Sequence, residues 1–261
     1  MNNFSLLHKF TYEVNDNITI NIPKVGDIWD SDSKYERYEK YYLSMVSLFT
    51  QTPTDMMIEL NDMGLDWTEV DEYSLFIILM SSFLSDINNP DFPVKWNSLF
   101  LNLDYKDIVL KADDTENNFV FVNSNGDVIF NKQIYNYISD LLCAVLLTTK
   151  NREYAKVPEI DTRKYILERA RLKRKRRLER LNNKRETTSS SALDGVILFL
   201  VNNNAFKYNF ETVKELSIYD LYASFKQINK NQEIDGLMTG YWYGNVDLSK
   251  ISDSKLKRII L

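Results

Sequence analysis

The residues that could carry nucleophilic or metal chemistry are too few in this chain to build the common sites. His8 is the only histidine and Cys143 the only cysteine. Catalytic triads and dyads, and most zinc sites, need a histidine beside a nucleophile, a carboxylate or a thiolate. Cys143 also lies in the apolar run of residues 141–145, which favours a buried, inert thiol. The sequence therefore predicts a protein that is not an enzyme and uses no cofactor.

Two groups of carboxylates have side chains suited to a hard cation. They are Asp27, Asp30 and Asp32 beside the turn at Gly26, and Asp113, Asp114 and Glu116 in a loop. A calcium loop of the EF-hand type would add a glycine within the loop and a distal bidentate glutamate, and neither group has them. We therefore interpret both groups as solvated turns and expect no metal site.

The sharpest feature of the chain is the charge of residues 163–185. Twelve of these 23 residues are Lys or Arg and only Glu168 and Glu179 oppose them, so the local charge is +10. Because the whole chain carries −5, the other 238 residues together carry −15. Such a separation indicates a helix or arm that meets an anionic surface, namely nucleic acid, an acidic protein or the acidic remainder of the same chain.

The pattern within this basic run favours a helix that is solvated or docks on a protein. A partial apolar face is formed by Ile166, Leu167, Ala170, Leu178 and Leu181. Arg174 and Arg177 interrupt that face, so we expect the middle of the helix to be solvated. The residues predicted to bind a partner here are Arg171, Arg174, Lys175, Arg176, Arg177 and Arg180.

Two other partners stay open for the basic run. Nucleic acid would neutralise the arginines, although only Tyr165 is available for base stacking and the acidic remainder would repel a long polyanion. A membrane surface is the weaker alternative, because no large aromatic or leucine face backs the charge. The longest apolar runs, 75–80 and 141–147, are far shorter than the ~20 residues of a membrane span. The N-terminal residues also lack the pattern of a signal peptide.

Residues 1–150 are predicted to form one α+β lobe, rich in helix and with two small β-hairpins. Alternating apolar residues predict the first hairpin over residues 10–22, with its turn at 15–17. One helical face is expected from the spacing of Tyr35, Tyr38, Tyr42, Met45 and Phe49. Further helices are expected at 52–64, 67–84 and 134–145, with short strands at 108–110, 119–122 and 128–130 and a turn at 123–127.

The remaining residues are predicted to be helical, with a linker between two parts. Asp161 or Thr162 is expected to cap the basic helix, and the Thr/Ser-rich residues up to 191 have the composition of a flexible linker. The last part contains expected helices at 193–201, after Ser217, and at 234–243. The fold class is therefore mainly α, of the α+β type. Its predicted parts are the lobe at 1–150, the basic helix and linker at 151–191, and a C-terminal helical segment at 192–261.

The order of segments from residue 151 onward resembles a known group of proteins. Asn-Arg-Glu-Tyr-Ala-Lys at 151–156 leads into the basic helix, and Phe-Lys-Tyr-Asn-Phe at 206–210 precedes Leu-Ser-Ile-Tyr-Asp-Leu at 216–221. The closing segment at 240–247 reads Gly-Tyr-Trp-Tyr-Gly-Asn-Val-Asp. These residues are similar to the tail-assembly or baseplate-assembly chaperone-type proteins of tailed bacteriophages. A lysine-rich segment at 255–257 departs from that group, in which a Trp is expected.

The resemblance implies a non-enzymatic protein of phage tail or baseplate morphogenesis. Its partner would be another tail protein, such as the tape measure or a baseplate hub component. The contacts would be the basic helix and the aromatic residues Tyr241, Trp242 and Tyr243. We expect it in the host cytoplasm during assembly. A permanent place in the virion, self-association, and binding of nucleic acid through the basic helix remain as alternatives.

Overall fold

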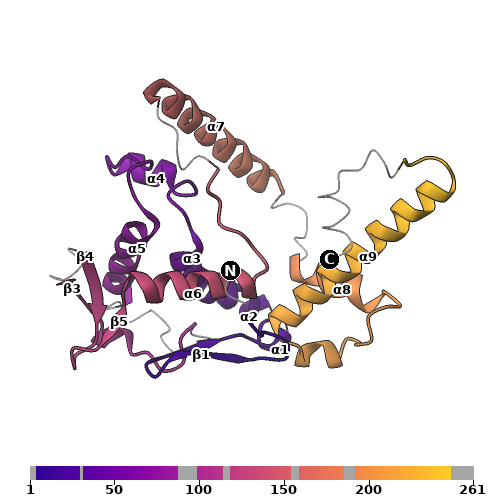
Figure 1. Ribbon diagram of the computed structural model, residues 1–261, viewed down its shortest axis with the longest axis horizontal. Coiled ribbons are helices and arrows are strands. Elements are labelled where there is room, and N and C mark those ends of the chain that lie inside the picture. The colour runs from indigo at the N-terminus through magenta and orange to yellow at the C-terminus, as the bar shows by residue number, and fades with distance from the viewer. Residues whose placement is uncertain are drawn as a thin grey trace.

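The computed structural model describes residues 4–29, 32–87, 99–113, 118–153, 159–184 and 192–247. Within these ranges the protein is a helix-rich α+β fold with one two-stranded and one three-stranded antiparallel sheet, which confirms the predicted fold class. Figure 1 shows the three-stranded sheet near one end of the molecule and α8 and α9 at the other. The predicted linker at 186–191, the predicted break at 88–93 and the tail from Leu248 lie outside the described residues.

The first sheet is the predicted hairpin of β1 (Thr11–Asn15) and β2 (Ile18–Asn21). In its turn the amide of Asn17 donates to the side-chain oxygen of Asn15 at 3.0 Å, as an Asx turn does. Alternation places the side chains of Ile18 and Ile20 on the buried face. The hairpin thereby covers one side of the core.

The tyrosine-rich helix is interrupted by a wider turn. It consists of α2 (Asp32–Arg37), the π-helical segment η1 (Tyr38–Leu43) and α3 (Ser44–Thr50). Tyr38 and Tyr42 are buried and their rings stack at 5.3 Å, so core packing explains the tyrosines at this spacing. The Tyr42 hydroxyl donates to the carbonyl of Asn21 at 2.8 Å, which ties the helix to the hairpin.

Aromatic rings from several elements meet at the centre of the N-terminal lobe. They belong to Phe49, Phe76, Phe100, Phe121, Phe130 and Tyr135. These rings are contributed in part by α5 (Glu72–Ile87), α6 (Lys132–Val145) and the sheet of β3 (Val109–Asp113), β4 (Asn118–Val122) and β5 (Val128–Phe130). Phe76 lies 4.8 Å from Phe49 and 4.9 Å from Tyr135, measured between ring centroids. The sequence patterns predicted both the strands and α6.

Two helices of the N-terminal lobe begin later than predicted. The helix expected from Trp67 begins at Glu72, since Asp71 accepts hydrogen bonds from the amides of Tyr73 and Ser74 at 2.8 and 3.0 Å. The helix expected from Thr52 is α4 (Met57–Asp62). Thr52 starts the turn that precedes α4, where its hydroxyl accepts from the amide of Asp55 at 3.3 Å and also contacts the carbonyl of Asn151 at 2.6 Å.

The basic helix, α7 (Ile160–Lys184), instead begins earlier than predicted. The Thr162 hydroxyl donates to the carboxylate of Glu159 at 3.1 Å, so Thr162 is not the cap. Asp161 lies inside the first turn. Of the helices found in the described ranges, none is both long and apolar enough to cross a bilayer.

The C-terminal helices are α8 (Ala192–Val201) and α9 (Ile218–Trp242). The sequence predicts a helix after Ser217 and another at 234–243, whereas α9 is one continuous helix, since the polar residues 229–233 between them contain neither Pro nor Gly. Ser217 caps α9 as predicted, accepting from the amide of Asp220 at 3.0 Å. The amide of Ile218 donates to the carbonyl of Pro23 at 2.9 Å. Buried residues of α8 and α9 belong to the same hydrophobic cluster as the N-terminal lobe.

Candidate interaction site

The first half of α7 docks on α4 and on the loop that follows it. Ile166, Leu167 and Ala170 pack against a hydrophobic cluster that is separate from the main core. The buried members of that cluster are Met57, Leu60, Trp67 and Leu75. The first part of the apolar face predicted for the basic run, Ile166, Leu167 and Ala170, is therefore used within the chain itself.

Three arginine–carboxylate pairs border this contact. Arg163 Nη1 lies 2.5 Å from Asp66 Oδ2, and Arg174 Nη1 lies 2.6 Å from Glu59 Oε1. Between them, Arg171 pairs with Asp62. The partner's number falls as the arginine's number rises, so the two segments run antiparallel. Part of the +10 charge is thus neutralised by the acidic remainder of the same chain, which was one of the three anionic surfaces considered.

The pair at Asp66 is the most enclosed of the three. Desolvation raises the pKa of the Asp66 carboxyl, but hydrogen bonds from Thr68 and the neighbouring Arg163 outweigh it, and the net pKa lies below the usual value. The pair at Glu59 explains why an arginine can stand at position 174 on the docked face. Half-exposed pairs of this kind contribute about 0.2–1 kcal/mol each.

The remaining predicted contact residues of α7 are exposed. Within the described ranges, no ion pair or hydrogen bond is made by the side chains of Lys175, Arg176, Arg177 and Arg180, nor by those of Arg169 and Lys173. The spacing of Arg169, Lys173, Arg176 and Arg180 places these four along one stripe of the helix, to one side of the docked face. Figure 1 shows α7 starting beside α4 and running toward the side of the molecule that holds α8 and α9. The helix therefore presents both a docked face and a cationic outer face.

The aromatic residues predicted to bind a partner form the exposed end of α9. Trp242 and Tyr243 are each 79% exposed, and Tyr241 is also exposed. The helix ends here because Gly244 has a φ of +73°, which favours glycine. The amide of Gly244 donates to the carbonyl of Tyr241 at 3.0 Å, and the amide of Asn245 donates to the carbonyl of Gly240 at 2.8 Å. This pair of hydrogen bonds is the Schellman motif.

The closing sequence motif thus has a structural role as a helix stop. A Cβ added at Gly240 would lie 2.6 Å from Val246 Cγ2, so Val246 can fold back on the helix only because residue 240 is glycine. The two glycines and the valine together fix the last turn. That turn holds the three aromatic side chains at a capped, ordered position.

We expect opposite effects on helix stability from alanine at one glycine inside α9 and at one glycine just after it. Gly244→Ala should destabilise the last turn by about 1 kcal/mol, because alanine is strained at positive φ. Gly236→Ala should stabilise the helix by about 0.5–1 kcal/mol, since position 236 lies inside α9 with open space around its Cα. Hydrogen exchange of the amides at 240–246 should speed up in the first variant and slow down or stay unchanged in the second. Equal behaviour of the two variants would contradict the assigned cap.

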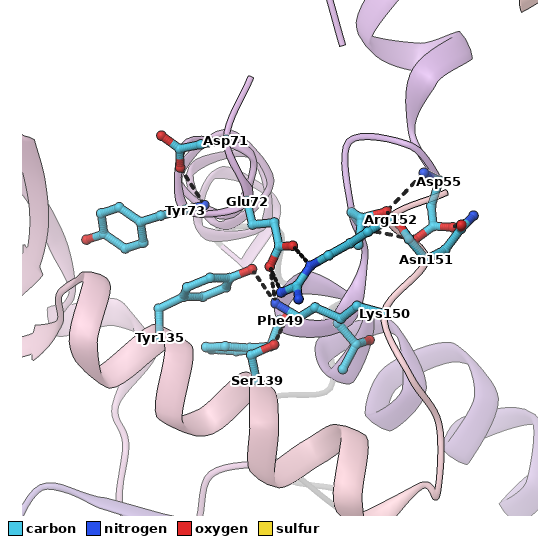
Figure 2. A network of polar contacts seen from close by, with 12 residues as sticks. Phe49, Asp55, Asp71, Glu72, Tyr73, Tyr135, Ser139, Lys150, Asn151 and Arg152 are labelled. Carbon is cyan, nitrogen blue, oxygen red and sulfur yellow. Dashed lines mark hydrogen bonds and ion pairs between the residues drawn. The ribbon is translucent and has the colours of Figure 1, made fainter. Parts of the chain in front are cut away.

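A polar network anchors the chain between α6 and α7 (Figure 2). The carboxylate of Glu72 receives Lys150 Nζ and Arg152 Nε, each at 2.5 Å. Lys150 Nζ also contacts the hydroxyl of Tyr135 at 3.3 Å and lies over its ring. Desolvation raises the pKa of Glu72, but the hydrogen bonds from Arg152 and Lys150 outweigh it and bring the pKa below its usual value. This network fixes the direction in which the chain leaves the lobe toward the basic helix.

The two carboxylate groups suited to a hard cation are only partly described in the structure. Asp27 accepts from the amide of Lys24 at 3.2 Å, and Asp30, Asp114 and Glu116 fall outside the described residues. No group of three or more metal-ligating side chains occurs in the described part of the chain. Cys143 is partly rather than fully buried, and burial raises the pKa of its thiol. The backbone amide of His8 donates to the buried carboxylate of Asp220.

Comparison with known proteins bears on the C-terminal part of the chain. Residues 179–256 match the family described as the second domain of YomV. This is a phage-type domain. The match to YomV begins within α7 and includes all of α8, α9 and the Schellman motif with its aromatic residues. No curated protein and no solved structure matches the chain. The phage character implied by the resemblance is thereby supported for this segment.

Proposed function

We propose that this protein acts in the assembly of a phage tail or baseplate by binding another tail component, without catalysing a reaction. The observation that carries the proposal is the exposed aromatic end of α9, meaning Tyr241, Trp242 and Tyr243, within a segment similar to a phage-type domain. The choice of tail or baseplate assembly as the specific process rests on the resemblance of residues 151–261 to phage assembly chaperone-type proteins.

The aromatic end has the physical properties of a binding anchor. Trp and Tyr bury large apolar areas at a low cost in side-chain entropy and dominate the energetics of many interfaces. The cap at Gly240 and Gly244 orders the backbone beneath these side chains before any partner arrives. Such preorganisation reduces the free-energy cost of binding.

The basic helix supplies a second contact of different chemistry. Its cations at 175, 176, 177 and 180 are exposed and make no ion pair with the described residues. Two weak contacts on one protein reinforce each other through effective concentration, provided that the partner can reach both. An apolar contact and an electrostatic contact would together hold a tail component during assembly in the host cytoplasm.

Co-purification with individual tail proteins tests this function. Each tail protein of the same phage, including the tape measure and the hub proteins, is co-expressed with the tagged protein. We expect at least one to be retained, and the double variant Trp242→Ala/Tyr243→Ala to lower its retention about 30-fold or more, as the loss of a hot spot of ~2 kcal/mol does. Phe119→Ala, which removes an exposed ring on β4, serves as the control and should leave retention unchanged.

Failure of the wild-type protein to retain any tail protein would contradict the proposal. If a tail protein is retained, mass spectrometry of purified phage particles distinguishes an assembly chaperone from a permanent tail component. An assembly chaperone is expected to be absent or scarce in the particle, whereas a permanent tail component is present in stoichiometric amounts.

A further inference from the structure

The docked face of α7 continues beyond the segment that covers it. We call this face the seam; its described members are Arg163, Ile166, Leu167, Ala170, Arg171, Arg174, Arg177 and Leu178. With 3.6 residues per turn, Leu178 falls three turns after Leu167 on the same side of the helix. The members up to Arg174 contact α4, its following loop or the cluster they form. Leu178 is 52% exposed and Arg177 is also exposed.

The covered part of the seam shows which chemistry fits it. The covering segment pairs Glu59 and Asp62 of α4, and Asp66 of the following loop, with three arginines. Met57 and Leu60 of α4 belong to the cluster on which the apolar residues of α7 pack. The helical part of this segment is therefore a short acidic amphipathic helix that runs antiparallel to α7. Because α4 has only six residues and begins at Met57, near the partner of Arg174, α7 extends about ten residues, or roughly 15 Å, beyond the N-terminal end of α4.

We propose that the uncovered part of the seam binds an acidic amphipathic helix of the partner protein, laid along α7 in line with α4. This inference rests on the proposed function, the binding of a tail component, and specifies which part of that component the basic helix would bind. Leu178 offers the next apolar contact of the seam, and Lys175 and Arg177 lie to either side of it. An α-helix with leucines at three- and four-residue spacing and flanking glutamates would repeat the α4 contacts one step further along.

Continuity with the α4 contact and charge complementarity favour this occupant over the alternatives. Nucleic acid would engage the cations by charge alone and would favour the outer face, where four of them follow one stripe. A second copy of the chain could present its own acidic surface. These two occupants predict different responses to substitution, which the experiment below separates.

The test measures binding of a fluorescein-labelled peptide to the purified full-length protein by fluorescence anisotropy. The peptide is an 18-residue helix (on the order of five turns) that repeats the apolar and acidic pattern of α4. A scrambled peptide of equal composition and charge serves as the peptide control. We expect a Kd of about 1–10 μM for the amphipathic peptide and binding at least about 10-fold weaker for the scrambled one.

Two matched pairs of variants locate the contact. Leu178→Ser and Arg177→Gln change the seam, and each should weaken the amphipathic peptide about 5-fold or more. Leu172→Ser and Arg176→Gln change the outer face, and each should alter binding less than about 2-fold. Leu172 is 56% exposed, close to the exposure of Leu178, and all four residues are exposed, so the variants should keep the fold.

Three results would overturn the proposal. Equal binding of both peptides, or equal effects of Arg176→Gln and Arg177→Gln, would reduce the contact to general electrostatics. Displacement of the peptide by a 20-nucleotide single strand or duplex at submicromolar concentration, with a steep dependence on salt, would assign the helix to nucleic acid. Dimerisation that excludes the peptide would assign the seam to a second copy. Retention of tail proteins through Trp242 is measured separately, so either proposal can fail while the other stands.

Discussion

Replacing Glu72 with glutamine is expected to lower the free energy of unfolding by about 3 kcal/mol, one of the two largest effects we predict. The Lys150 side chain is only 8% exposed, and the Glu72 carboxylate is its neutralising partner at 2.5 Å. Removing one member of an enclosed ion pair leaves the other charge uncompensated, which costs about 3–5 kcal/mol in fully buried pairs. The expected loss lies at the lower end of this range because glutamine keeps one acceptor oxygen and Lys150 keeps its contact with Tyr135.

A double-mutant cycle separates the lost pair from the lost side chain. Lys150→Met alone removes the cation, and the combination with Glu72→Gln should recover about 1 kcal/mol or more relative to the sum of the single changes. Glu69→Gln, in the loop just before α5, is the control because Glu69 is exposed, and its effect should stay within about 0.5 kcal/mol. Urea denaturation followed by circular dichroism gives all four values. Additive effects within error would contradict the assigned coupling.

The same network predicts a loss of stability in acid. The folded-state pKa of Glu72 lies below its usual value, so its contribution is fully present above the unfolded-state pKa of about 4.3. That contribution is lost as the pH falls through the lower, folded-state pKa. The wild-type protein should therefore lose more stability below about pH 4.5 than Glu72→Gln does.

Trp67→Ala should release α7 from the body of the protein without unfolding the main core. Trp67 is buried in the cluster on which Ile166 and Leu167 pack, and that cluster is separate from the aromatic centre. Truncating a buried Trp costs about 3–5 kcal/mol. The three ion pairs that remain contribute too little to hold the helix in place.

Limited trypsin digestion measures this release. Cleavage within residues 163–174, the docked part of α7, is expected to accelerate about 100-fold in Trp67→Ala, because local opening exposes the Lys and Arg bonds there. Trp242→Ala is the matched control, since it removes a Trp that is exposed and should leave the digestion rate unchanged. If the α7 bonds are cut at the wild-type rate in Trp67→Ala, the separate cluster does not hold the helix.

Local patterns predicted the parts of the fold that local interactions decide. The alternation of Ile18, Ile20 and Ile22 predicted a buried strand face, and all three are fully buried. The Ser217 cap and the stop at Gly244 follow from side-chain and backbone preferences within a few residues. The helix α6 was predicted because its apolar face repeats at helical spacing from Ile134 to Val145, about three turns.

The remaining features depend on residues far apart in the sequence. Arg174 interrupts the apolar face of the basic run, and its partner Glu59 lies 115 positions away, so no local pattern could reveal the pairing. Trp67 begins an apolar pattern that fits a helix, but it packs as a turn residue because Asp71 caps α5 instead. The residues of the aromatic end and of the basic helix could be picked out from the sequence alone. Which side of the basic helix docks on the protein, and which side faces outward, could be seen only in the fold.

The hydrogen bonds that join the two ends of the fold bear on how the chain folds as it leaves the ribosome. The amide of Val25 donates to the carbonyl of Leu216 at 2.8 Å, and Ile28 shares one hydrophobic cluster with Leu221 and Ile228. A nascent chain therefore cannot cover the apolar surface around Val25 and Ile28 until more than two hundred residues have been synthesised. Non-local contacts of this kind slow folding and leave apolar surface exposed in the meantime. Truncated products that end before α9 should consequently aggregate or be degraded, and folding is completed only after the phage-type segment has emerged.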